Sequence, residues 1–261
     1  MQKPSCYSQG HASAFQEAPV ADAYAYRPPY PPGVFTLLVD LLPHDAQRLL
    51  DVGCGTGAVA RHLIHLGLPI DAVDISEAMV TRGKQLPNGD HSLLQWHIGA
   101  IETVDLTPPY GLITAGESLH WMEWETILPR FAHLLQSNGN LVILDLGHET
   151  VPWSAELGKL IQQYSTNQTY QPIDLIAELT SRGLFAEKGR TTTAPWPFKQ
   201  SVEAYVESFH GRASFSRERM RTADAETFDN AVQEAVRQYT QHDVELPIVA
   251  TVVWGKPLAS T

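Results

Sequence analysis

The residues best suited to chemistry lie in the segment LLDVGCGTGA at positions 49–58. There an apolar run ends in the carboxylate of Asp51 and breaks into a glycine-rich turn, in which a ligand can lie against the main chain. A second apolar run ends in Asp74, about 20 residues further along, where nucleotide-type sites hold a pair of ribose hydroxyls. This spacing predicts a nucleotide-type site with Asp74 on the ribose.

Two classes of cofactor fit this loop. Gly53, Gly55 and Ala58 satisfy the dinucleotide pattern G-x-G-x-x-G/A, which is typical of nicotinamide-dependent oxidoreductases. Asp51 disfavours that interpretation, because a carboxylate at the tip of the strand repels a pyrophosphate. It attracts a ligand with a cationic amino group and no phosphate. S-adenosyl-L-methionine is such a ligand, with a ribose for Asp74 and an α-ammonium for Asp51.

The motifs LLDVGCGTG at 49–57 and AVDIS at 72–76 resemble those of the class I S-adenosylmethionine-dependent methyltransferases. The later stretch ESLHW at 117–121 is similar to one in small-molecule methyltransferases, including relatives of the trans-aconitate carboxyl methyltransferases. The resemblance covers residues 24–146 well and the rest weakly. It implies an α/β fold, a Rossmann-like, mostly parallel sheet of seven strands with helices on both faces and a helical cap.

The resemblance also implies which residues hold S-adenosyl-L-methionine. The glycine loop offers backbone to the methionine part, and Ile75 packs against adenine. The family usually carries Gly-Asp-Ala-Glu after the third strand, whereas this chain has Gly-Ala-Ile-Glu at 99–102, so adenine has to rely on backbone near Ala100 and Ile101. The complete expected set is Tyr26, Arg27, Asp51, Gly53, Cys54, Gly55, Asp74, Ile75, Ala100, Ile101, Glu117 and Ser118.

His120 is the candidate catalytic residue. It follows the predicted fourth strand, where backbone or side chain near Glu117 should face the sulfonium and His120 and Trp121 should border the methyl group. An imidazole, with an ordinary pKa of about 6.5, can take a proton from an attacking hydroxyl or amine near neutral pH. A packing or cofactor-contact role is equally compatible, because methyl transfer needs alignment more than acid–base help and a carboxylate acceptor needs no base.

A proline-rich arm, YAYRPPYP at 24–31, resembles the arm of the same subgroup. Its prolines stiffen the chain, and Arg27 can form a bidentate pair with the cofactor carboxylate. A surface proline turn is the alternative interpretation. The polar residues 1–20 show no periodicity and predict a loose N-terminal arm.

The spacing of apolar residues predicts strands alternating with helices, which favours a parallel sheet with right-handed crossovers. The expected strands lie near 48–53, 69–74, 93–98, 111–115, 141–144, 185–193 and 248–254. The expected helices lie near 35–42, 57–65, 77–86, 123–135, 157–164, 173–182, 202–209 and 228–239. The resemblance implies that the last strand runs antiparallel beside the sixth. The motif TPPY at 107–110 looks like that of amino-methyltransferases acting on DNA, but it precedes the fourth strand and is expected to be a loop.

We expect an N-terminal arm or lid at 1–32 and a single methyltransferase domain at 33–261. Insertions at 148–172 and 196–244 begin at the carboxyl edge of the sheet, where ligands of open α/β sheets bind, and therefore predict a cap over the cofactor. The alternative is that these insertions add core helices elsewhere.

Composition excludes several classes. A formal net charge of −11 over 261 residues opposes a nucleic-acid surface, and no apolar run approaches the roughly 18 residues of a membrane span. The N-terminus has no hydrophobic signal core, and two cysteines give no disulfide framework, so a cytoplasmic location is expected. His62 and His65 are the only close histidine pair on an expected helix and lack further ligands, so no metal is expected. The oligomeric state stays open.

We therefore expect a methyltransferase acting on a small organic molecule by direct displacement at the sulfonium, with the acceptor atom (oxygen, nitrogen, carbon or a carboxyl group) unresolved. The alternatives are a nicotinamide-dependent oxidoreductase and a non-catalytic cofactor-binding protein of the same fold. In the last case the cap residues Phe209, Phe215 and Trp196 would face the core and leave no substrate cavity.

Overall fold

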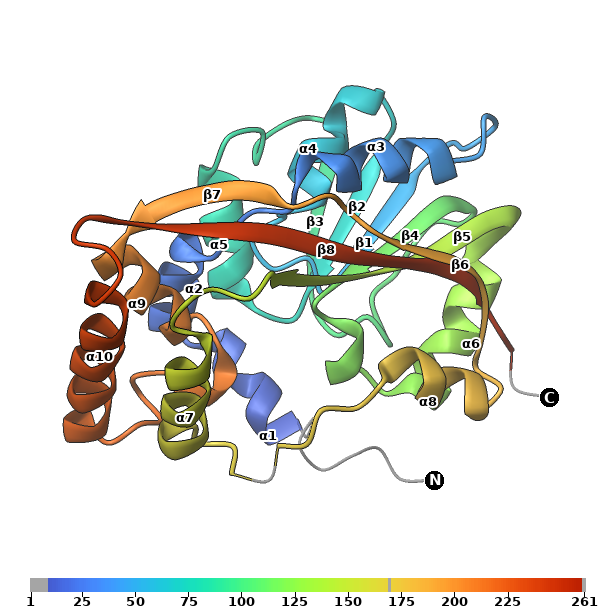
Figure 1. The fold of residues 1–261 in the computed structure, drawn as a ribbon. Helices are drawn as coiled ribbons and strands as arrows, with labels where there is room; N and C mark the ends of the chain where they lie inside the picture. The colour runs from blue at the N-terminus through green and yellow to red at the C-terminus, as the bar shows by residue number, and fades with distance from the viewer. Residues whose placement is uncertain (1–8, 169, 260–261) are drawn as a thin grey trace. The chain divides into compact units, whose positions relative to one another are not determined.

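A computed structural model describes residues 9–168 and 170–259 (Figure 1). The chain forms two compact units. The sheet unit comprises the described residues of Tyr30–Gly147, Pro172–Ala194 and Val249–Thr261. The helical unit comprises the described residues of Met1–Pro29, His148–Gln171 and Pro195–Ile248. Three segments that are far apart in the sequence thus fold together in the helical unit.

The strands form a mixed sheet in the order β3-β2-β1-β4-β5-β8-β6, with β7 paired to β8. Their bounds are β1 (Leu49–Val52), β2 (Ile70–Asp74), β3 (Leu94–Ile98), β4 (Tyr110–Gly116), β5 (Leu135–His148), β6 (Phe185–Thr192), β7 (Trp196–Ser201) and β8 (Asp243–Pro257). The pairs β1–β2, β1–β4, β2–β3 and β4–β5 are parallel, whereas β6 and β7 run antiparallel to β8. The predicted α/β class and the antiparallel last strand beside the sixth are confirmed.

Helices cover both faces of the sheet unit. They are α3 (Pro32–Leu41), α4 (Ala60–Leu63), α5 (Glu77–Gln85), α6 (Trp124–Leu134) and α8 (Leu175–Ser181). Side chains of β1 alternate between two apolar clusters: Leu50 and Val52 pack in the cluster with α6 and α8, and Leu49 packs in the cluster with α3 and α4. The central strands β1, β2 and β4 are therefore buried on both faces, which explains why they are mostly apolar.

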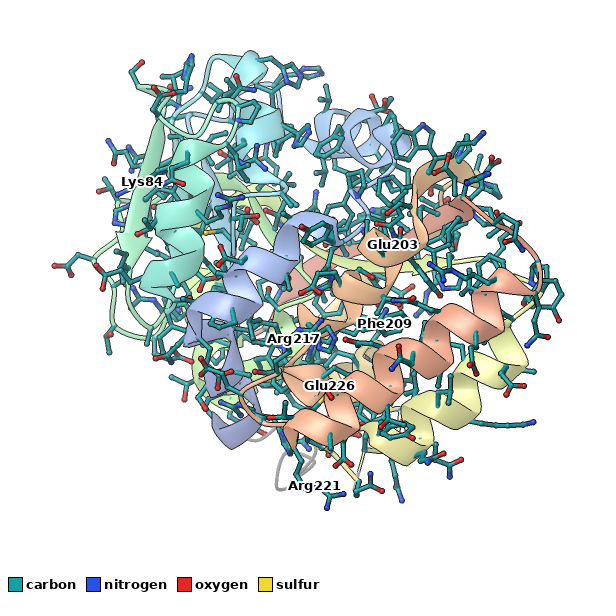
Figure 2. All side chains as sticks on the ribbon, turned by 90° about the vertical axis from the view of Figure 1, so that its left-hand side faces the viewer. Lys84, Glu203, Phe209, Arg217, Arg221 and Glu226 are labelled. Atoms are coloured by element: carbon teal, nitrogen blue, oxygen red, sulfur yellow. The ribbon has the colours of Figure 1, made fainter. Side chains whose placement is uncertain are left out.

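The helical unit has its own aromatic core. Its helices are α1 (Gln9–Ala12), α2 (Ala18–Ala23), α7 (Ser154–Tyr164), α9 (Val202–His210) and α10 (Thr222–Arg237). The ring centroid of Phe209 on α9, labelled in Figure 2, lies 5.6 Å from that of Phe228 on α10. The Phe215 ring stacks on Phe228 with 4.8 Å between the two centroids. Phe209 and Phe215 thus face the core, the placement that the non-catalytic alternative expects of them, whereas Trp196 is half-buried in β7.

The expectation of a loose arm is wrong for its described part. From Gln9 to Tyr26 the chain forms short helices, and α2 lies against α9. Arg219 donates from Nε to Glu17 Oε1 at 2.7 Å and from a terminal nitrogen to Ser13 Oγ at 2.9 Å. Because these anchors come from about 200 residues away along the chain, local periodicity gives no sign of them. Residues 1–8 of the expected arm lie outside the described residues.

Several local predictions differ in extent. The helix expected at 57–65 begins only at Ala60, because Gly55 and Gly57 have φ of +54° and +76° and continue the turn. Residues 196–201 form β7, a short strand with an internal proline that weakens its strand signal, so the sheet has one strand more than expected. Ser76 caps α5, with its hydroxyl accepting the Met79 N–H at 3.2 Å. Within the described residues, no helix is long and apolar enough to cross a membrane.

Candidate cofactor and active site

The glycine loop after β1 is pressed against the segment that follows β4. Gly53 has a φ of +60°, and a Cβ atom there would lie 2.4 Å from Ser118 Cβ and 3.1 Å from Met122 Cε. The Ser118 hydroxyl donates to the Val52 carbonyl at 2.7 Å. Both the backbone conformation and the lack of space require glycine at position 53. Met122 was not among the expected site residues, because its contact with the loop depends on the fold.

Asp74 at the end of β2 holds the glycine loop in place through a hydrogen bond. Its Oδ2 accepts the Gly55 N–H at 2.7 Å, and its Oδ1 accepts the Ser76 N–H at 2.8 Å. Burial raises the pKa of Asp74, while the two backbone donors oppose that rise. Each carboxylate oxygen can accept more than one hydrogen bond. Asp74 can therefore hold the loop and still accept hydroxyl groups of a ligand.

Asp51 in β1 is almost fully buried on the side of α4. Its Oδ1 accepts the Thr114 hydroxyl at 2.7 Å, and its Oδ2 accepts the Ala60 N–H, the first of α4, at 3.2 Å. Burial raises the pKa of Asp51 to about 7, the two hydrogen bonds lower it, and the nearby charge of Asp74 adds to the rise. The carboxylate thus occupies the helix N-terminus that a pyrophosphate would need.

Two exposed apolar side chains lie at the ends of β2 and β3. Ile75 is 54% exposed and Ile98 is 50% exposed, although both are large aliphatic residues. Asp74 pairs with Ile98 across the two parallel strands, so Ile75 and Ile98 belong to the same edge of the sheet. Such exposed apolar surface suits a flat aromatic ligand group. Ile75 was expected at the site, whereas Ile98 was missed because its exposure cannot be read from the sequence.

Ala100 and Ile101 follow β3 and were expected to meet adenine through their backbone. Ile101 is 5% exposed and packs in the cluster with α6. The Ala100 carbonyl accepts the N–H groups of Thr103 and Val104 at 3.0 and 3.1 Å, which makes a turn after β3. A contact of this segment with adenine through its backbone stays a prediction.

Glu117 is held tightly where β4 ends. It has a φ of +53°, which is unusual for a residue with a side chain. Its N–H donates to the Leu144 carbonyl at 3.0 Å, and its Oε1 accepts the Leu146 N–H at 2.9 Å. Both the backbone and the carboxylate of Glu117 thus tie the end of β4 to β5, and a contact of this segment with the sulfonium stays a prediction.

His120 lies in the short helical turn η5 (Leu119–Trp121) directly after this segment. Its ring is half-buried and its centroid is 4.8 Å from a ring of Trp121, at an interplanar angle of 54°. Trp124 secures the turn through an indole N–H that donates to the Leu119 carbonyl at 2.9 Å. The turn thus places an imidazole at the carboxyl edge of β4, within the segment that also supplies Ser118 and Met122.

Cys54 in the loop is buried. Its N–H donates to the Val73 carbonyl at 3.0 Å, and its carbonyl accepts the Gly57 N–H at 2.8 Å. Burial raises the pKa of its thiol well above the ordinary value, and the charges of Asp74 and Asp51 add to the rise. Cys54 therefore contributes backbone to the site and a neutral side chain.

The arm residues Tyr26 and Arg27 belong to the helical unit. Arg27 donates to the Tyr24 hydroxyl at 3.0 Å, and its guanidinium lies 4.9 Å from the centre of the Tyr24 ring. Tyr26 is 42% exposed. Their contact with a cofactor stays a prediction. Tyr30 is the first residue of the sheet unit. A Cβ atom added to Gly116 would lie 2.5 Å from the Tyr30 hydroxyl oxygen. No local pattern in the sequence predicts that Tyr30 lies at the end of β4.

The TPPY motif does not contribute to this edge. Its first three residues form the loop before β4, as expected. Tyr110 is fully buried and donates its hydroxyl to Asp71 Oδ2 at 2.7 Å, while His97 Nε2 lies 2.7 Å from Asp71 Oδ1. The tyrosine thus belongs to a buried polar network of the core.

Over part of its length the chain is similar to known methyltransferases. The family described as a methyltransferase domain matches residues 50–141, from β1 into β5. An uncharacterized methyltransferase of Mycobacterium tuberculosis is 31% identical over 138 residues, covering 52% of this chain and 54% of its own length. A malonyl-[acyl-carrier protein] O-methyltransferase of Magnetococcus marinus is 29% identical over 143 residues, covering 54% of this chain and 49% of its own length. The chain spans about half the length of the curated relatives it matches.

A similar fold is known from a solved structure of an S-adenosylmethionine-dependent methyltransferase of Thiobacillus denitrificans in complex with S-adenosyl-L-homocysteine. Its TM-score is 0.52 at 12% identity, covering 92% of this chain and 97% of the other. At this identity the likeness concerns the fold alone. The prediction of a methyltransferase-type Rossmann-like fold is confirmed, and the finer resemblance to the trans-aconitate methyltransferase subgroup stays a prediction.

Proposed function

We propose that the protein is an S-adenosyl-L-methionine-dependent methyltransferase that methylates a small organic molecule. The observation that carries this proposal is the pair of buried carboxylates, Asp51 and Asp74, at neighbouring strand ends around the glycine loop. A ligand that combines a ribose with a cationic amino acid group complements both of them. The matched family and the relatives named as methyltransferases support the same class of reaction.

The chain's residues fit this cofactor better than a dinucleotide. A pyrophosphate would meet the Asp51 carboxylate at the start of α4, where it would be repelled. Asp74 has the lone pairs to accept ribose hydroxyls, and Ile75 and Ile98 offer apolar surface to adenine. The loop between Gly53 and Gly55 would hold the methionine part through its backbone.

Bound S-adenosyl-L-methionine supplies a methyl group on a cationic sulfur that is ready for direct displacement. The protein's own contribution is alignment of the acceptor with that methyl group, because orientation supplies much of the rate of such a reaction. We propose that His120, in the turn that follows β4, takes the proton of a hydroxyl or amine acceptor. The relative named as an O-methyltransferase supports an oxygen acceptor, whose identity within that class stays open.

A turnover assay tests the proposal. The protein is incubated with methyl-labelled S-adenosyl-L-methionine and a panel of small carboxylic acids, alcohols and amines, and formation of S-adenosyl-L-homocysteine is measured. We expect product with at least one acceptor class and a large loss of product in Asp74→Ala. The exposed-loop variant Asp105→Ala is the matched control and should behave as the unmodified protein. Cofactor binding without turnover across the panel would favour the non-catalytic alternative.

A further inference from the structure

Two buried carboxylates, Asp51 and Asp74, flank the glycine loop. In the part of the chain that the structure describes, the recorded hydrogen bonds to Asp51 and Asp74 come from neutral donors, three backbone N–H groups and one hydroxyl. The third titratable group near them, the Cys54 thiol, is held neutral by burial, which raises its pKa. Two adjacent buried negative charges are costly unless a cation accompanies them. The free site therefore favours a proton on one of the two carboxyl groups.

Thr114 on β4 decides which carboxyl group can hold that proton. Its hydroxyl lies 2.7 Å from Asp51 Oδ1 and 3.4 Å from the Leu50 carbonyl. A hydroxyl can donate one hydrogen bond and accept others. When Asp51 is ionised, Thr114 donates to Asp51; when Asp51 is protonated, Asp51 donates to Thr114, and the threonine proton turns to Leu50. Both protonation states of Asp51 are thus satisfied without movement of the backbone.

Among the described residues, no hydroxyl group is found hydrogen-bonded to Asp74. Both of its oxygens accept backbone N–H groups, which cannot reverse their direction and therefore stabilise the ionised form. Burial alone raises the pKa of Asp74, whereas Asp51 is raised to about 7 by burial together with the Asp74 charge. The hydrogen-bond geometry and the charges therefore both indicate that Asp51, and not Asp74, is the carboxyl group that gains and loses the proton.

We infer that Thr114 is a positioning residue that lets Asp51 hold a proton in the free protein and lose it to solvent when a ligand bearing an ammonium group binds. This inference rests on the proposed function. The proton leaves the Asp51 carboxyl group for the buffer, the Thr114 hydroxyl reverses its hydrogen bond, and the ammonium replaces the proton as the positive charge beside the carboxylate. Affinity for an ammonium-bearing ligand should therefore rise with pH until Asp51 is ionised in the free protein and then level off.

Calorimetric titration in two buffers of different ionisation enthalpy measures the released proton. S-adenosyl-L-homocysteine is the probe, and 5′-methylthioadenosine, which keeps the adenosine and sulfur but lacks the ammonium, is the matched control ligand. We expect S-adenosyl-L-homocysteine to release close to one proton per site at about pH 6 and almost none at about pH 8. The control ligand should release none at either pH.

Three variants separate the role of Thr114 from a general structural one. In Thr114→Val the ionised carboxylate loses its hydroxyl donor, so at about pH 8 the variant should still release a proton and bind the probe about tenfold more weakly. Thr114→Ser keeps the hydroxyl and should behave as the unmodified protein. Asp51→Asn cannot titrate, so its proton release should fall to that of the control ligand.

The outcomes are distinct. Binding of S-adenosyl-L-homocysteine with no proton release at pH 6, or equal release with 5′-methylthioadenosine, overturns the inference and leaves the proposed function standing. Failure of the probe to bind at all overturns both. The comparison of the two ligands uses the unmodified protein, so the inference stays testable even if Thr114→Val does not fold. Equal proton release by Thr114→Val and the unmodified protein would remove Thr114 from this role.

Discussion

Asp74 is a single residue that connects two parts of the candidate site, the glycine loop and the start of α5. One carboxylate holds the glycine loop through Gly55 and the start of α5 through Ser76. We expect Asp74→Ala to weaken binding of S-adenosyl-L-methionine by about 1–3 kcal/mol, the scale for hydrogen bonds to a charged group. Asp51→Asn should weaken it less. Calorimetry on both variants and on the control Asp105→Ala checks this order, and a smaller loss for Asp74→Ala than for Asp51→Asn would contradict it.

The protonation of Asp51 also predicts how stability depends on pH. The pKa of Asp51 is about 7 in the folded protein and 3.8 ordinarily, so between these values the folded state binds the proton more tightly than the unfolded state. Its contribution to the free energy of unfolding is therefore fully present below about pH 4 and is lost as the pH rises to about 7. The stability of the unmodified protein relative to Asp51→Asn should fall across this window in urea denaturation. A constant difference would show that Asp51 is ionised throughout.

Substitution of His120 distinguishes an acceptor that needs a general base from one that does not. If the acceptor is a hydroxyl or an amine, His120→Ala should lower turnover by about 10²–10⁴-fold and remove the acidic limb of the pH profile, because a positioned general base is lost. We expect this outcome, since His120 follows β4 where the acceptor must approach the methyl group. Near-normal turnover with an unchanged pH profile would remove His120 from the catalytic residues and leave alignment as the source of rate.

The sequence was sufficient to predict the positions of residues that contribute through their backbone conformation or through their charge. Gly53 and Gly55 were expected to turn the loop, and both have positive φ. Asp51 and Asp74 were expected at the strand ends and are found there. Met122, Ile98 and Thr114 could not be predicted in their roles, because each acts through contacts or exposure that only the folded chain creates.

At the scale of elements, Arg219 holds the N-terminal helices. It binds Glu17 and Ser13 while largely shielded from solvent, whereas Arg221, two residues later and labelled in Figure 2, pairs with Asp224 at 86% side-chain exposure. Arg219→Ala should lower the free energy of unfolding by about 1–2 kcal/mol and speed proteolysis within residues 9–26. Arg221→Ala should change little, because exposed ion pairs contribute little. Equal effects of the two variants would contradict this account.

Helices and strands could be predicted from the sequence where apolar residues keep one regular spacing along the whole element. α6 is found at Trp124–Leu134 with Pro129 inside it, close to the expected 123–135, because its apolar stripe is continuous. β7 and the helices between Gln9 and Tyr26 were missed, since a short strand with proline and a polar stretch carry weak local signals. Their structure comes from pairing with β8 and from the anchors at Arg219.

For the whole molecule, described residues of 9–29, 148–171 and 195–248 form the helical unit, while the sheet unit contains the strands of the nucleotide-type fold. The strand order led us to expect insertions at 148–172 and 196–244, and their role as insertions stays a prediction. Their association with residues 9–29 could not be predicted, because it depends on side chains such as Glu17 and Arg219 that no local pattern links. A role of the helical unit as a cap over the cofactor remains a proposal.

We propose that the carboxyl edge of this sheet holds S-adenosyl-L-methionine. This can be measured by calorimetric titration of the unmodified protein with S-adenosyl-L-methionine, S-adenosyl-L-homocysteine and NAD. We expect saturable binding of the first two at one site, a clear loss of both in Asp74→Ala, and no binding of NAD. Tight binding of NAD with none of S-adenosyl-L-methionine would overturn the proposal and assign the glycine loop to the dinucleotide-binding class.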